Sequence, residues 1–429
     1  MGIIMLYMNQ PNQSFFTKSP IQLLQYASGL SDVAIINYLD QHDTQWSFIG
    51  QTPVQTIQTK SMTDVDALTP MINQSIADND GTVWVIATTY EWGAHQLHPQ
   101  FQHMTPHAIY MQFDRGVWLN HRTQMVHVFG ETMDWLSHDF TSASIALPSV
   151  KLNPKWTKAQ FSQAIADAQS LIKEGDIYQI NLSYPCTLNT TASCADIFSS
   201  IIGQQLPHCS GYISSNDTHI ASLSPEEFFT IHNGTIRTRP IKGTIGRHEN
   251  PVLDAAAYDE LKASTKDHAE LVMITDLLRN DLGRCATIGS VNVDELCQIH
   301  GFDYVYHLVS TITAKLEPEL SAYDALRLLA PGGSITGCPK ISACKAIQSI
   351  EDFPRQFYTG HMGFLSSTGD AAFNVAIRTC YQVGDAPILA HTGCGITIDS
   401  DANQEFQESV DKLRFVTDYV DVAPISTCI

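Results

Sequence analysis

The C-terminal third of the chain carries a strand and turn pattern that limits the folds open to it. Residues 361–365, 372–383 and 388–392 are strand-like, and the segments between them, SSTGD and GDAP, have the composition of hairpin turns. Such short connections join antiparallel strands, because parallel neighbours need a long crossover. Long helical stretches, such as residues 258–282, lie between the strand-rich regions. The pattern predicts an α+β fold in which helices pack on the outer faces of antiparallel sheets.

The length of the chain predicts more than one structural region. A chain of 429 residues, 44% hydrophobic and 16% charged, can bury a large core. Residues 1–150 contain strand-like runs such as residues 82–88 but no recognisable catalytic spacing, so we interpret them as a scaffold region. A helix is then predicted to begin after Thr157, which can cap it, and to end at Gly175. We place a boundary before this helix and a functional region over residues 151–420.

Charge and cysteine content argue against several classes of protein. The 44 acidic and 24 basic residues give a net charge of -20, which disfavours a nucleic-acid or anionic-membrane surface. The ten cysteines form no C-x-x-C pair, so reduced core thiols are expected rather than a zinc site or a disulfide framework. The N-terminal sequence MGIIMLYM lacks the basic region and cleavage site of a secretion signal, and no apolar run approaches 18 residues. We therefore expect a cytoplasmic location and no nucleic-acid or membrane partner.

Two acidic pairs are each spaced i, i+3 on a predicted helix. Asp267 and Glu270 share a face of one helix, and Glu405 and Glu408 share a face of another. Such pairs are usually solvated helix faces. Alternatively, the two helices could present four carboxylates to one Mg²⁺ ion, which prefers oxygen ligands and keeps several waters. The spacing alone leaves both interpretations open.

Three further patterns are compatible with ligand binding. Alternation over residues 371–381 places Arg378 on a face of small polar residues, where a guanidinium could bind a carboxylate or could simply be a surface charge. His307 alternates with valines on a predicted strand; a satisfied core histidine is the commoner outcome, although its titration range suits acid–base chemistry. Glycine-rich segments 332–340 and 391–397 could bring backbone close to a ligand or could be ordinary turns.

Seven motifs occur in order between about residues 155 and 417. They are EGDIYQINLS (174–183), SPEEFF (224–229), RPIKGT (239–244), ELVMITDLLRNDLGR (270–284), GGSITGCPK (332–340), YTGHMGF (358–364) and GCGITIDSDANQEFQESVDK (393–412). Together they resemble the chorismate-utilising enzymes, a family that includes the large subunits of anthranilate synthase and aminodeoxychorismate synthase. The resemblance implies a fold of the anthranilate synthase component I type, with antiparallel sheets packed face to face, and a catalytic domain over residues 151–420.

The resemblance also implies a set of ligand contacts. Chorismate carries two carboxylates, which an acidic chain must neutralise. By the family pattern, Mg²⁺ binds one carboxylate and is held by Glu270 and Glu408, with Asp267 and Glu405 nearby or acting through water. Arg378 and Tyr358 match the family's contacts to the other carboxylate end. The remaining residues implied to line the substrate are Gly243, Thr244, Ser334, Gly393 and Gly395.

Lys242 separates two branches of this family. Anthranilate synthases carry Ala at the matching position, whereas bacterial aminodeoxychorismate synthases carry a lysine that acts as a covalent nucleophile. The resemblance therefore implies amination of chorismate at C4: Lys242 attacks C2 as the C4 hydroxyl leaves, and ammonia then replaces the lysine. Desolvation favours the neutral, nucleophilic form of an amine. Glu226 matches a proton relay, and His307 matches either an acid near the leaving hydroxyl or an orienting hydrogen-bond partner.

The amination needs a source of ammonia. No glutaminase module is recognisable in the chain, so we expect a separate glutamine amidotransferase subunit and a heterodimer. Two alternatives stand beside this hypothesis. One is anthranilate synthase component I, which eliminates pyruvate and forms an aromatic product. The other is a non-catalytic chorismate-binding or regulatory module, which predicts missing metal acids or a missing lysine, whereas this sequence has both.

Overall fold

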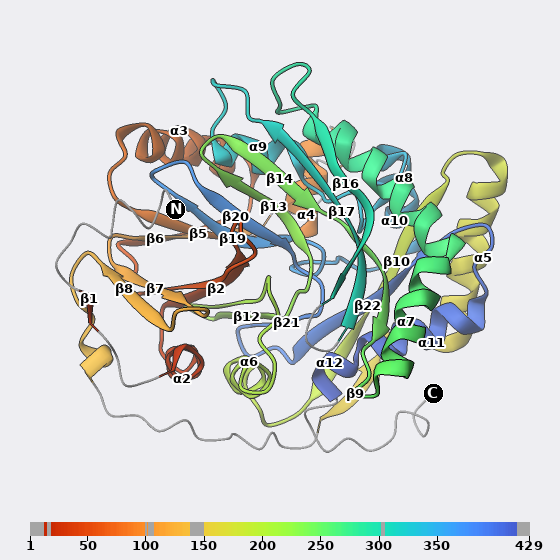
Figure 1. Cartoon of the computed structure of the whole chain (residues 1–429), viewed down its shortest axis with the longest axis horizontal. Helices are drawn as coiled ribbons and strands as arrows, with labels where there is room; N and C mark the ends of the chain where they lie inside the picture. Colours follow the sequence, from red (N-terminus) through yellow and green to blue (C-terminus); the bar gives the residue numbers. More distant parts are fainter. Residues whose placement is uncertain are drawn as a thin grey trace.

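Two large antiparallel sheets form the body of the molecule (Figure 1). A computed structural model describes residues 13–14, 19–98, 101, 107–137, 150–301 and 305–417. The first sheet contains, in spatial order, β1 (Gln13–Ser14), β8 (Met125–Phe129), β7 (Gly116–Asn120), β3 (Gln45–Gln51), β2 (Val33–Leu39), β11 (Gly211–Ser215), β12 (Thr218–Ser222), β21 (Thr379–Val383), β22 (Ile388–Ile396), β10 (Gln179–Asn189) and β18 (Gly337–Cys338), with β9 (Lys151–Pro154) paired to β10. The second contains β15 (Ile241–Gly246), β17 (Val305–Lys315), β14 (Thr235–Arg239), β13 (Glu227–His232), β20 (Ala371–Val375), β19 (His361–Ser366), β5 (Val83–Thr88), β6 (Ala108–Phe113) and β4 (Gln55–Thr59), with β16 (Asn292–Gly301) paired to β17.

Alternating side chains along the strands supply both faces of the core. On β2, Ala34 and Ile36 pack between the two sheets, in one cluster with Val85 of β5. Val33 and Ile35 belong instead to a cluster with the apolar residues of helices α2 (Pro20–Ser28) and α6 (Cys194–Ile202). Because successive side chains of a strand point to opposite faces, one strand can pack against a sheet and a helix at once. The expectation of face-to-face antiparallel sheets with helices outside them is confirmed.

The remaining helices cover the other outer surfaces (Figure 1). They are α3 (Met62–Asp78), α4 (Tyr90–Leu97), the 3₁₀ helix η2 (Asp134–Ser137), α5 (Lys158–Glu174), α7 (Pro251–Ala263), α8 (Thr265–Leu282), α9 (Ala322–Leu329), α10 (Lys340–Ile350), α11 (Ala402–Lys412) and α12 (Arg414–Thr417). Helix α5 begins and ends as predicted, with Thr157 accepting from the Gln160 N–H and Gly175 at φ +86°. Within the part of the chain described, no helix is long and apolar enough to cross a membrane.

The prediction of one long helix over residues 258–282 is wrong. The helix is broken at Ser264, which has an extended backbone (φ −68°, ψ 96°) and divides α7 from α8. The Ser264 hydroxyl accepts a hydrogen bond from the backbone N–H of Asp267, so it caps α8. The break places the first acidic pair in the opening turns of a new helix.

The expected continuous meander at the C-terminus is also divided. Strands β19 and β20 pair in the second sheet, whereas β21 and β22 pair in the first. The chain crosses between the sheets at residues 376–378, and Arg378 has a left-handed backbone (φ +48°). Regular alternation therefore ends before Arg378, and a bend positions this side chain instead.

Strands from both sides of residue 150 lie in both sheets. β2 pairs with β11 in the first sheet, and β5 pairs with β19 in the second. The boundary at residues 150 and 151 stays a prediction. Nine of the ten cysteines are described, and all nine are free, seven of them buried, as expected for reduced core thiols. The N-terminal segment MGIIMLYM lies outside the described residues.

Candidate active site

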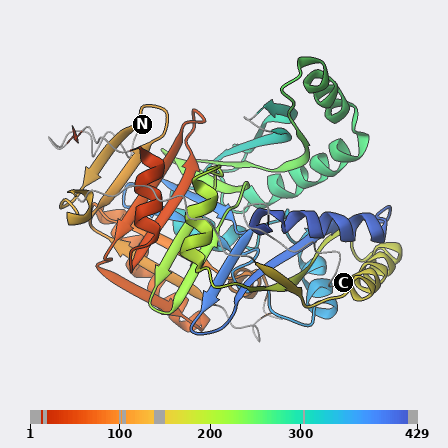
Figure 2. The ribbon, with the colours of Figure 1, turned by 90° about the horizontal axis from the view of Figure 1, so that it is seen from below.

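A cavity of about 880 Å³ collects every site residue that the sequence analysis singled out. Helices α7 and α8 lie on one side of this region and α11 on the other (Figure 2). The fourteen predicted residues that line the cavity are Glu226, Lys242, Gly243, Thr244, Asp267, Glu270, His307, Ser334, Tyr358, Arg378, Gly393, Gly395, Glu405 and Glu408. Segments far apart in the sequence thus meet here, while the role of each residue stays a prediction.

Lys242 reaches the cavity from an irregular strand. Between Lys242 and Thr244 the pairing of β15 with β17 shifts register, and Gly243 adopts φ +65°. The Lys242 Nζ lies 4.0 Å from Glu270 Oε2, and the lysine side chain is 21% exposed, so the amine is inside the cavity rather than in bulk solvent. A Cβ on Gly395 would lie 3.8 Å from this nitrogen, an ordinary contact distance, so the amine lies beside strand β22.

Gly243 provides the first testable prediction. At its positive φ, alanine costs about 1–3 kcal/mol, and its Cβ would lie 2.9 Å from Asp267 Cγ and 2.8 Å from Leu261. We expect Gly243→Ala to lower both the free energy of unfolding and turnover. Gly234→Ala is the matched control, because Gly234 has φ +70° with nothing within 4 Å of the added Cβ. Urea denaturation should show a loss of stability in both variants, larger in Gly243→Ala because of its close contacts. Turnover should fall only in Gly243→Ala, and equal turnover in both variants would contradict a role for Gly243 in the site.

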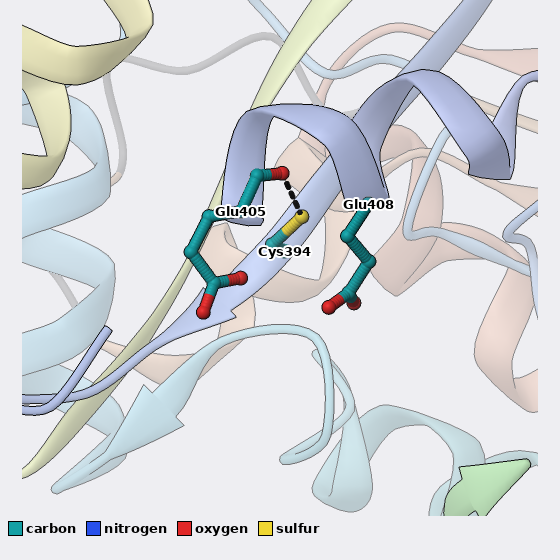
Figure 3. Close-up of side chains that lie close together, drawn as sticks. All are labelled: Cys394, Glu405 and Glu408. Carbon is teal, nitrogen blue, oxygen red and sulfur yellow. Dashed lines mark hydrogen bonds between the residues drawn. The ribbon is translucent and has the colours of Figure 1, made fainter. Parts of the chain in front are cut away.

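The two acidic pairs line one cavity, but each pair has its own hydrogen-bond and ion-pair partners. On α8, Glu270 lies 4.0 Å from Lys242 and 3.9 Å from the Lys266 Nζ. On α11, Glu405 accepts a hydrogen bond from Ser400 at 2.8 Å, and Glu408 pairs with a lysine. Within the described residues, the compact group of potential metal ligands comprises Glu405 and Glu408 with Cys394, not all four acids (Figure 3). Coordination of one ion by both helices therefore stays a prediction.

The pKa values of the two carboxyl groups on α11 are shifted in opposite directions. Desolvation raises the pKa of Glu405, the Ser400 hydrogen bond opposes this, and the negative charge of Glu408 adds to the rise. Desolvation alone would also raise the pKa of Glu408, but the ammonium groups of Lys412, Lys242 and Lys266 reverse the effect and lower it. Glu408 is thus held in its anionic form.

Lys412 is a site residue that the sequence analysis missed. Its Nζ lies 2.8 Å from Glu408 Oε1 and donates to the Gly393 carbonyl at 3.0 Å. It therefore links α11 to the glycine-rich strand β22. The signal was present in the motif ESVDK, where Glu408 and Lys412 are spaced i, i+4, but such a pair ordinarily indicates only an exposed helix face.

Glu226 and His307 have shifted protonation equilibria. Desolvation raises the pKa of Glu226, against a Ser334 hydrogen bond and the charges of Lys242 and Lys412, so its proton is retained closer to neutral pH. Desolvation, with the positive charge of Arg378, lowers the pKa of His307 to about 4. His307 Nδ1 lies 2.8 Å from the Thr244 hydroxyl. At neutral pH the imidazole is uncharged, which suits an orienting hydrogen bond better than a cationic acid.

Tyr358 and Arg378 both line the cavity, and Arg378 lies where the chain crosses between the sheets. The Tyr358 ring stacks on His391, with centroids 5.1 Å apart and an interplanar angle of 13°. Burial raises the pKa of Tyr358, so its hydroxyl keeps the proton and can donate. A guanidinium and a phenol therefore line the same cavity, and their joint binding of a carboxylate stays a prediction.

The cavity as a whole carries opposed charges. Its six acidic residues are Glu226, Glu260, Asp267, Glu270, Glu405 and Glu408, and its four Lys and Arg residues are Lys242, Lys266, Arg378 and Lys412. Carboxyl groups thus exceed lysine and arginine side chains by two. The fold and this cavity define a two-sheet α+β protein with a cavity of mixed charge large enough for a small polar ligand.

Comparison with known proteins identifies the family. The profile described as chorismate binding enzyme matches residues 34–418. The chain belongs to the chorismate binding enzyme family, which confirms the resemblance read from the motifs. The match also begins well inside the region interpreted as a scaffold.

Individual relatives include members with different activities. The chain is 39% identical to aminodeoxychorismate synthase component 1 of Salmonella typhimurium over 258 residues, which cover 60% of this chain and 57% of that protein. It is 37% identical to anthranilate synthase component 1 of Streptomyces coelicolor over 259 residues, covering 60% and 50%. The matches thus span little more than half the length of these relatives. Anthranilate synthase component I from Streptococcus pneumoniae has the same fold, with a TM-score of 0.72, 23% identity and coverage of 96% and 97%.

Proposed function

We propose that this chain aminates chorismate at C4 with ammonia, giving 4-amino-4-deoxychorismate. The observation that carries the proposal is the Lys242 amine, which lies in the family's cavity beside Glu270, where the resemblance implies Ala for an anthranilate synthase. The similarity to aminodeoxychorismate synthases supports it, although 39% and 37% identity to the two kinds of synthase would not distinguish them alone.

A divalent cation is part of the proposal because of charge. A cavity with two more carboxyl groups than lysine and arginine side chains repels a dicarboxylate unless positive charge is added. Glu270 and Glu408 supply the carboxylate oxygens that suit Mg²⁺, and Asp267 and Glu405 would act nearby or through water. Bound there, Mg²⁺ would neutralise one substrate carboxylate. Arg378 and Tyr358 are proposed to bind the other carboxylate end, with the backbone at Gly243, Thr244, Ser334, Gly393 and Gly395 lining the substrate.

The proposed chemistry exchanges one substituent at C4 in two displacements. Lys242 first gives up its proton to solvent, and its amine nitrogen then forms a bond to C2 as the ring double bond shifts. The C4 hydroxyl leaves as water with a proton supplied by Glu226. Ammonia then bonds to C4, the double bond shifts back, and the C2–nitrogen bond to lysine breaks. Protonated Glu226 fits the first step because its raised pKa retains the proton that the leaving hydroxyl needs. His307 is proposed to orient the leaving hydroxyl.

Ammonia is proposed to come from a separate glutamine amidotransferase subunit in a heterodimer. The relatives named component 1 support a partner of some kind for this chain. We further propose a cytoplasmic location, which the nine free cysteines support, because thiols stay reduced there.

The product identifies the activity. The purified chain is incubated with chorismate, Mg²⁺ and ammonium, and the product is determined by mass. We expect aminodeoxychorismate, which retains the enolpyruvyl group, and no released pyruvate. Anthranilate with stoichiometric pyruvate would instead assign the chain to anthranilate synthase component I. This activity is the second candidate because the chain is 37% identical to an anthranilate synthase component 1. Chorismate binding without any product would indicate the non-catalytic module.

A further inference from the structure

Cys394 lies against the two carboxylates of α11. It occupies the centre of the GCG sequence on β22, and its Sγ lies 3.1 Å from the backbone carbonyl of Glu405. One side-chain ligand atom from each of Cys394, Glu405 and Glu408 lies within 4.8 Å of the other two (Figure 3). The three side chains come from a strand and from adjacent turns of the helix above it, so the backbone fixes their spacing.

The environment of this trio favours a bound cation. Glu405 and Glu408 both line the cavity, so an ion from solvent can reach them. Glu405 is 4% exposed, and one of its carboxylate oxygens lies within 4.8 Å of a carboxylate oxygen of Glu408. Glu408 also pairs with Lys412 at 2.8 Å, so a divalent cation has to compete with that ammonium group for the carboxylate.

The sulfur changes which cation suits the site. Mg²⁺ takes oxygen ligands, whereas a thiolate selects softer ions such as Zn²⁺. Zinc binds sulfur at about 2.3 Å and carboxylate oxygen at about 2.0–2.2 Å, and it accepts three protein ligands with a fourth position open. The three ligand atoms lie within 4.8 Å of one another, so their side chains must turn toward a common point to reach these bond lengths.

We infer that Cys394, Glu405 and Glu408 form a site for a soft divalent cation, which binds there in place of the proposed magnesium. On binding, the thiol releases its proton to solvent and the sulfur exchanges its contact with the Glu405 carbonyl for a bond to the ion. The cation then occupies Glu405 and Glu408, so the chain is inhibited by zinc. This inhibition rests on the proposed function, whereas the binding does not.

Binding is measured without turnover, using Cd²⁺ as the probe. The full, reduced chain is titrated with Cd²⁺, and the ultraviolet band of the cadmium–thiolate bond is recorded. We expect a saturable band that Mg²⁺ does not produce. Cys394→Ser should lose this band, while Cys297→Ser and Cys338→Ser, which alter the two partly exposed cysteines among the nine described, should retain it. Glu405→Gln leaves the thiol in place and should weaken Cd²⁺ binding by at least about 10-fold.

Each outcome decides the inference separately from the activity. Absence of the band in the natural chain, or a band of equal strength and affinity in Cys394→Ser, overturns the site. If Cys394→Ser does not fold, unchanged Cd²⁺ affinity in Glu405→Gln overturns it equally. Turnover is then assayed with added Zn²⁺, and each variant is compared with its own zinc-free rate. The zinc concentration that halves the rate should be at least about 10-fold higher for Cys394→Ser than for the natural chain. A Cd²⁺ band in a chain that makes no aminodeoxychorismate would leave the site standing and remove the proposed function.

Discussion

Lys242→Ala is expected to lower the rate of chorismate amination by at least about 10³-fold, because the variant lacks the proposed nucleophile. The amine lies 4.0 Å from Glu270 inside the cavity, on a strand whose irregular register directs it there. Formation of aminodeoxychorismate is measured by mass at saturating chorismate, Mg²⁺ and ammonium. Alanine also removes a positive charge next to Glu270, so the loss of rate alone does not establish a covalent role.

A covalent intermediate changes the mass of the protein itself. If Lys242 bonds to C2, a chain incubated with chorismate and Mg²⁺ and quenched with acid before ammonium is added should be heavier by one chorismate less one water. Intact-protein mass spectrometry measures this gain, and digestion locates it. Lys242→Ala should show no gain. An unmodified natural chain that still forms aminodeoxychorismate would mean that the lysine acts without a covalent bond.

Lys266 offers the matched control for charge. Its Nζ lies 3.9 Å from the same Glu270, yet its side chain is 66% exposed and projects from the helix that carries Glu270. An exposed pair of this kind contributes less than about 1 kcal/mol, so Lys266→Ala should change the rate by no more than about fivefold. Equal losses in Lys242→Ala and Lys266→Ala would attribute the effect to the charge of the site and would contradict the nucleophile.

Motifs located the site residues better than local patterns located the fold. The resemblance named fourteen residues, and all of them line one cavity, because a shared family fold brings the same motifs together. Periodicity alone left the acid pairs undecided between a solvated face and a metal site. Lys412 was missed for the same reason, since an i, i+4 pair with Glu408 looks identical on an exposed helix and on a cavity wall.

The errors in the fold have local causes. A serine inside an apolar-periodic run is compatible with helix, and only the placement of α7 and α8 decides that Ser264 ends one helix and caps the next. Turn composition predicts that a strand reverses direction, but it carries no information about which sheet receives the following strand. The crossing at residues 376–378 therefore could not be predicted, and with it the bend that brings Arg378 into the cavity.

Arg355→Met is expected to lower the free energy of unfolding by about 3–5 kcal/mol, because it leaves a buried carboxylate without its partner. The Arg355 and Glu351 side chains are each 1% exposed and make two hydrogen bonds to each other, at 2.6 and 2.8 Å. Arg355 also donates to the carbonyls of Asn181 and Ile335, two residues that line the cavity. Urea denaturation measures the loss, and we expect turnover to fall as well, since these contacts hold the cavity wall in place.

A surface ion pair and a double variant test whether the loss of stability in Arg355→Met comes from burial of the unpaired carboxylate. Arg279 and Asp276 are paired at 2.9 Å but are 58% and 72% exposed, so Arg279→Met should cost less than about 1 kcal/mol. Replacing both buried partners, Arg355→Met with Glu351→Leu, should cost less than Arg355→Met alone, because no unpaired charge then remains in the core. A double variant less stable than the single one would indicate that the ion pair itself, and not the unpaired carboxylate, dominates. The free energy would then reside in the fixed geometry of the guanidinium between Glu351, Asn181 and Ile335.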